Sequence, residues 1–70
     1  MKEIDSYRLG NVQVKINETE KSNKLKVECF DGQYHSEFTV STYEFNNYRR
    51  LMNQRITQAY AKQKEDDASG

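Results

Sequence analysis

The stretch 24–40 constrains the fold most strongly, because apolar and polar residues alternate through it on both sides of a single turn signal. Alternation with a period of two is typical of a half-buried strand. The dipeptide Asp31-Gly32 between the two runs tolerates the positive φ angles of a tight hairpin turn. We therefore predict strands at 24–30 and 33–40, joined as an antiparallel hairpin.

A two-residue turn would also set the register of this hairpin. On the apolar face it places Cys29 opposite Tyr34, Val27 opposite Ser36 and Leu25 opposite Phe38. On the polar face it places Glu28 opposite His35 and Lys26 opposite Glu37. Both charged pairs are favourable, and we take this agreement between the two faces as support for the register.

A further strand is predicted at 11–17, where three β-branched residues alternate with polar ones. The polar stretch 18–23 is expected to be an exposed loop. Residues 1–10 are ambiguous: their apolar residues fit an edge strand or a loose arm, and Gly10 ends either one.

A capping box predicts a helix that begins after Ser41, because the side chains of Ser41 and Glu44 can each accept a hydrogen bond from the other residue's backbone N–H. Apolar residues then recur at the spacing of one helical stripe. Neither proline nor glycine interrupts the run, so we predict one continuous helix at 42–63. The stretch 65–70, which opens with three acidic residues, is expected to be a disordered tail.

These elements predict an α+β fold in one domain, residues 1–64, with a three-stranded antiparallel sheet and one C-terminal helix packed on one face in the order β-β-β-α. The expected core consists of Val12, Val14, Ile16, Leu25, Val27, Cys29, Tyr34, Phe38, Val40, Phe45, Tyr48, Met52, Ile56 and Ala59. Leu51 and Tyr60 lie at the margins of a broad apolar helix stripe.

Seventy residues form only a small core, and such domains usually need disulfides, a metal or a partner chain. A disulfide within one chain is excluded because Cys29 is the only cysteine. A structural zinc site is not expected, since there is one histidine and such sites use about four Cys or His ligands. Self-association is the remaining means of stabilising so small a domain, and we therefore expect a homodimer.

The sequence shows no catalytic site, and we expect no enzyme activity, no cofactor and no metal. Cys29 is interpreted as a buried small hydrophobe and His35 as half of a surface cross-strand pair. The acidic groups of 18–20 and 65–67 are interpreted as solvated charge. No long apolar run or signal pattern at Met1 is present, so we expect a cytoplasmic protein.

The function that we expect is non-catalytic protein binding, by a phage or mobile-element inhibitor of a host protein. Tyrosine and arginine dominate interface hot spots, and the predicted helix carries both. The candidate partner-binding residues are Tyr43, Phe45, Tyr48, Arg50 and Tyr60. The partner would be a host or cognate protein, and no membrane is implicated.

Nucleic-acid binding is the alternative. Eleven basic and eleven acidic residues balance over the whole chain, but the stretch 41–64 carries five basic residues against Glu44 alone. Its basic side chains are Arg49, Arg50, Arg55, Lys62 and Lys64. Either this helix or the lysine-bearing face of the sheet would contact phosphates. A structural subunit of a larger assembly is the third class.

The stretch from Lys24 to Tyr60 resembles the small phage-encoded uracil-DNA glycosylase inhibitors of the sheet-plus-helix type. The shared features are the Asp31-Gly32 hairpin, the return strand containing Tyr34, and a helix opened by Ser41 with Glu44-Phe45 in its first turn. The resemblance implies a pair of chains whose helices grip an apolar loop residue of a host enzyme. Phe45 and Tyr48 would form that pocket. Those inhibitors imitate acidic DNA, whereas this helix is basic.

Overall fold

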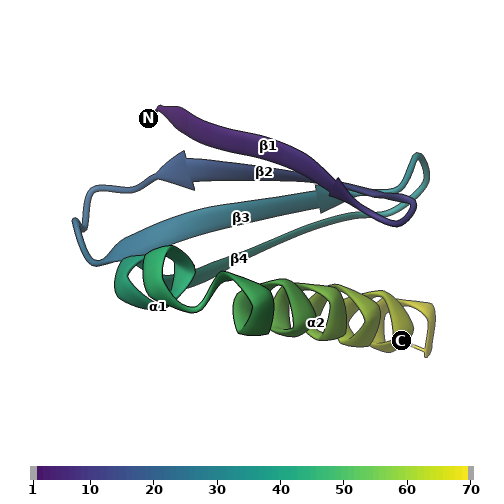
Figure 1. The fold of residues 1–70 in the computed structure, drawn as a ribbon. Helices are drawn as coiled ribbons and strands as arrows, with labels where there is room; N and C mark the ends of the chain where they lie inside the picture. Colours follow the sequence, from purple (N-terminus) through teal and green to yellow (C-terminus); the bar gives the residue numbers. More distant parts are fainter. Residues whose placement is uncertain (1, 70) are drawn as a thin grey trace.

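Four antiparallel strands and two helices make up residues 2–69, which the computed structural model describes. They are β1 (Glu3–Leu9), β2 (Val12–Glu18), β3 (Lys24–Phe30), β4 (His35–Ser41), α1 (Thr42–Asn47) and α2 (Arg49–Ser69). The strands form one meander in the order β1-β2-β3-β4, and both helices lie on the same side of it (Figure 1). The predicted α+β class and the C-terminal helix are confirmed, but the sheet has four strands and not three.

The additional strand, β1, lies in the N-terminal segment that the sequence left ambiguous. Gly10, with a φ of 64°, turns the chain so that Leu9 pairs with Val12. The register shifts between Glu3 and Asp5, which marks a β-bulge. A bulge adds one residue to the strand and interrupts its alternation, so the apolar residues of β1 do not follow a single period of two.

The β3–β4 connection differs from the predicted two-residue turn, because residues 31–34 all lie between the strands. The Asp31 carboxylate accepts backbone N–H bonds from Gln33 at 2.9 Å and Tyr34 at 2.8 Å. The backbone N–H of Asp31 also donates to the Tyr34 carbonyl at 3.3 Å, so the side-chain bonds of this Asx turn add to a backbone bond across the loop. Gly32 takes the positive φ, 100°.

The longer loop shifts the hairpin register by two residues, so the predicted partners are wrong. The pairs are Leu25 with Val40, Val27 with Phe38, Cys29 with Ser36, Lys26 with Thr39, Glu28 with Glu37 and Phe30 with His35. A shift of two keeps every side chain on its predicted face, because the side-chain period of a strand is two. The predicted apolar and polar faces are therefore kept. The directly opposite residues change, but both predicted charged pairs still meet diagonally across the strands, with Lys26 3.1 Å from Glu37 and His35 3.9 Å from Glu28.

The core lies between the sheet and the helices. Its buried apolar residues are Val14, Ile16, Leu25, Val27, Cys29, Phe45, Met52, Ile56 and Tyr60. The expected burial of Cys29 is confirmed, and burial raises the pKa of its thiol to about 11. Tyr48, expected in the core, is exposed, and Tyr60, expected at the margin, is buried. The buried hydroxyl of Ser36 donates to the Gln63 side chain.

The predicted single helix is interrupted at Tyr48, whose φ of −131° and ψ of 54° are not helical. Ser41 caps α1, accepting the Glu44 N–H at 3.3 Å. This is one of the two bonds of the predicted capping box; the Glu44 carboxylate, predicted to accept the Ser41 N–H, instead pairs with Arg55 at 2.7 Å. At the other end of α1, the Asn47 side chain donates to the Tyr43 carbonyl at 2.9 Å. Side chains that bond to nearby backbone groups compete with helix continuation, which accounts for an end here.

Beyond the break, α2 runs across the sheet from β1 to the β3–β4 loop. At its start, Arg49 forms an ion pair with Asp5 of β1. Near its end, Lys64 lies 2.6 Å from the Asp31 carboxylate. The helix continues to Ser69, through most of the 65–70 stretch for which we expected disorder, and Gly70 lies outside the described residues.

Candidate functional site

The largest group of exposed apolar side chains lies where α1 meets α2. Tyr43, Tyr48 and Leu51 expose 65%, 51% and 43% of their surface. We call these three residues the junction patch. Within residues 2–69, the other exposed large apolar residues are Ile4 in β1 and Phe30 in β3, which belong to other parts of the fold.

The helix break creates the junction patch. In a continuous helix, side chains five positions apart point about 140° away from each other around the axis. Here the rings of Tyr43 and Tyr48 meet edge to face, with their centroids 6.0 Å apart. Tyr48 also lines a surface hollow together with Leu51. The three side chains are thus contiguous.

The same break removes Tyr48 from the core. Three positions separate Phe45 from Tyr48, and residues at this spacing share one face of a regular helix. Phe45 is buried, so a continuous helix would turn Tyr48 toward the sheet as well. The non-helical backbone at Tyr48 instead leaves its ring in solvent.

The surroundings of the junction patch are polar and basic. Its hollow is completed by Asn47, Arg49, Arg50 and Gln54. Arg49 is bound to the fold: its guanidinium lies 4.0 Å from the Phe45 ring centroid and 5.1 Å from that of Tyr7. Arg50 forms no ion pair with the described residues and is exposed. It therefore gives the rim a positive charge.

The five predicted partner-binding residues fall into two groups. Tyr43, Tyr48 and Arg50 are exposed and close together, at the junction. Phe45 and Tyr60 are 3% and 6% exposed, so their rings are not accessible on the monomer. Tyr60 donates its hydroxyl to the Tyr34 carbonyl at 3.2 Å, and burial raises its pKa to about 12. Leu51 joins the patch, although the sequence placed it only at the stripe's margin.

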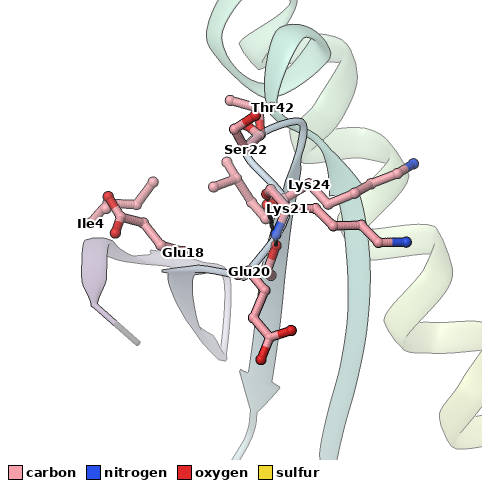
Figure 2. Close-up of a pocket in the computed structure, with 9 residues that line it drawn as sticks. Ile4, Glu18, Glu20, Lys21, Ser22, Lys24 and Thr42 are labelled. Atoms are coloured by element: carbon pink, nitrogen blue, oxygen red, sulfur yellow. Dashed lines mark hydrogen bonds between the residues drawn. The ribbon is translucent and has the colours of Figure 1, made fainter.

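A second hollow lies beside the β2–β3 loop, close to the start of α1. Figure 2 shows the side chains of Glu18, Glu20, Lys21 and Lys24 around it: the two lysines extend to the same side, whereas the carboxylates of Glu18 and Glu20 point away from them and from each other. A catalytic or anion-binding site needs converging polar groups. This arrangement agrees with the interpretation of the loop carboxylates as solvated charge.

Searches for a matching family model, curated protein or solved structure found none. None of the helices in residues 2–69 has the length and hydropathy to span a membrane. The candidate site therefore stands on its own geometry.

Proposed function

We propose that this chain is a non-catalytic protein-binding module that docks through the junction patch onto an apolar, acid-rimmed surface of a partner protein. The observation that carries the proposal is the contiguous exposure of Tyr43, Tyr48 and Leu51 at the helix break. Exposed apolar patches on small domains mark interaction sites. Tyrosine suits such a surface because its ring is apolar and its hydroxyl can still bond to water.

A stable interface is larger than these three side chains, so the docking surface must extend beyond them. A standard interface buries about 800 Å² on each partner. That is about one sixth of the 4985 Å² accessible surface of this chain. The contact must therefore include the rim, where Arg50 favours an acidic partner group.

The ion pairs of the helices separate this proposal from nucleic-acid binding by the basic side chains of 41–64. Three of these five basic residues are neutralised within the fold, by Asp5, Glu44 and Asp31. Phosphate binding depends on cations that are free to replace counterions. Arg50 and Lys62 are the only two of the five without a carboxylate partner among the described residues.

A second copy of this chain is the competing occupant, as the expected homodimer would require. In a twofold interface the same patch faces itself. A dimer centred on the junction patch would bring the unpaired Arg50 of each copy to one interface, which electrostatics disfavours. We therefore assign the patch to a different protein. Inhibition of a host protein is the form of this function that the resemblance suggested, although the buried Phe45 leaves only Tyr48 of its two pocket residues accessible.

A matched pair of double variants tests the proposal. Tyr48→Ala with Leu51→Ala removes the patch, while Ile4→Ala with Phe30→Ala removes exposed apolar surface elsewhere. Each tagged variant is used to retrieve proteins from a bacterial lysate, and binding of any retrieved protein is then measured with purified components. We expect one protein to be retained by the wild type and the Ile4/Phe30 variant and lost from the Tyr48/Leu51 variant. Equal retention by both variants would overturn the proposal.

Sedimentation of the wild type distinguishes the two occupants. A monomer at about tens of micromolar is the result expected for a patch that binds a different protein. A dimer that the Tyr48/Leu51 variant converts to monomer would assign the patch to a second copy.

A further inference from the structure

Two carboxylates lie directly opposite each other on the outer face of the sheet. Glu28 of β3 and Glu37 of β4 are cross-strand partners. Like charges in this position destabilise a strand pair unless a cation lies between or beside them. A positive charge near Glu28 and Glu37 would therefore stabilise this part of the sheet.

His35 completes a cluster with these two carboxylates. It precedes Glu37 by two residues on β4 and therefore shares its face. Its Nε2 atom lies 3.9 Å from Oε1 of Glu28. One ligand atom from each of the three side chains can be chosen so that all lie within 4.8 Å of one another.

The separations are close to those of a metal site. Ligand atoms bound to one zinc ion at about 2.0–2.2 Å stand about 3–3.5 Å apart. Small side-chain rotations would bring the three atoms from 4.8 Å or less to this spacing. Glu37 and His35 are exposed and Glu28 is half-buried, so such rotations are open to them.

One carboxylate is already oriented. The Asn17 side chain donates to Oε2 of Glu28 at 2.7 Å, which leaves Oε1 facing His35. Hydrogen bonds of this kind fix ligand orientation in metal sites. Lys26 lies 3.1 Å from Oε1 of Glu37 and lowers the pKa of that carboxyl group. It supplies positive charge to the pair and would have to share Glu37 with a bound ion.

We propose that Glu28, His35 and Glu37 form a binding site for a divalent transition-metal ion of the zinc type. An imidazole nitrogen with two carboxylate oxygens suits Zn²⁺ or Co²⁺, whereas Mg²⁺ and Ca²⁺ prefer all-oxygen sites. Three protein ligands leave further coordination positions for water. The site lies on the sheet and is separate from the junction patch on the helices.

The sequence did not indicate this site, for two reasons. A single histidine predicts no structural zinc site, because such sites use about four Cys or His ligands. The predicted register also paired Glu28 with His35 and Glu37 with Lys26, which left no two carboxylates opposite each other. The four-residue loop is what brings Glu28 and Glu37 together.

The test is titration of the untagged protein with Zn²⁺ by calorimetry, and with Co²⁺ by its visible absorption. The variants are His35→Gln and Glu37→Gln, and the matched control is Glu20→Gln in the β2–β3 loop. We expect saturable binding of one ion per chain, weakened at least about tenfold in both site variants and unchanged in the control. Mg²⁺ at the same concentration should not compete.

Unfolding of each variant by heat confirms that it is folded, and Zn²⁺ should raise the midpoint of the wild type because it binds the native state. The absence of saturable binding up to about 1 mM Zn²⁺, a concentration at which even weak sites fill, would overturn the proposal. So would unchanged affinity in the His35→Gln variant, since the ion would then bind elsewhere.

Discussion

The edge of one tyrosine ring meets the face of the other where Tyr43 and Tyr48 approach across the helix break, at 6.0 Å between centroids and 63° between ring planes. This geometry is typical of favourable aromatic pairs. The contact is specific to the broken helix, because a continuous one would separate the two rings. It holds the two exposed tyrosines as one preformed surface. For the proposed partner, this would lower the entropic cost of ordering these side chains on binding.

Two tyrosines of the helices should respond very differently to truncation. Tyr60→Ala removes a buried ring and should lower the free energy of unfolding by about 3 kcal/mol or more. Tyr48→Ala removes an exposed ring and should change it by about 0.5 kcal/mol or less. Urea unfolding measures both. A larger loss in Tyr48→Ala than in Tyr60→Ala would contradict the placement of the break.

Two neighbouring arginines provide a second matched pair. Arg49→Ala removes the ion pair with Asp5 and the stacking on Tyr7 and Phe45, and should cost about 1–2 kcal/mol of stability. Arg50→Ala should leave stability unchanged within about 0.5 kcal/mol, because the side chain is exposed and unpaired among the described residues. Arg50→Ala should instead weaken partner binding, more so at low salt. Thermal unfolding and affinity measurements on both variants separate the two roles.

The β3–β4 loop should make the free energy of unfolding depend on pH in the acid range, through the carboxyl group of Asp31. The Lys64 ammonium, followed by the N–H groups of Tyr34 and Gln33, holds the pKa of Asp31 well below its usual range. The charged carboxylate is therefore favoured in the native state. Its contribution is complete above the ordinary aspartate pKa of about 3.9, and is lost as the pH falls from there through the lowered value.

Asp31→Asn tests this dependence, because asparagine keeps an oxygen for the two N–H groups but carries no charge. Between about pH 6 and pH 3, a range that spans the ordinary aspartate pKa, the urea midpoint of the wild type should fall further than that of the variant. Lys64→Met should reduce the acid sensitivity in the same way. Identical pH profiles for the wild type and both variants would exclude the ion pair as its source.

Much of the fold could be predicted because faces depend only on local alternation. Leu25, Val27 and Cys29 are buried as expected, since an error of two residues in register does not change the side of a sheet on which a residue lies. The partners could not be predicted, because they depend on the length of the loop. Asp31-Gly32 indicated a two-residue turn, whereas the Asp31 side chain stabilises a longer one.

The candidate site was predicted in part for a similar reason. Exposed Tyr43 and Arg50 followed from their positions beside the apolar stripe. The predicted burial of Tyr48 and the predicted marginal position of Tyr60 are both wrong. The predicted apolar stripe assumes one regular helix, whereas the chain is not helical at Tyr48. Asn47 was the available signal, since asparagine favours helix ends over helix interiors.

The exposure of the junction patch with and without its partner tests the central claim most directly. Hydroxyl-radical footprinting of the free chain and of its complex with the retrieved protein reports this exposure residue by residue. We predict that Tyr43, Tyr48 and Leu51 react in the free chain and are protected in the complex, while Phe30 on the sheet stays reactive in both. Protection of Phe30 with continued reaction of Tyr43 and Tyr48 would contradict the account, because the partner would then bind the sheet and not the helix junction.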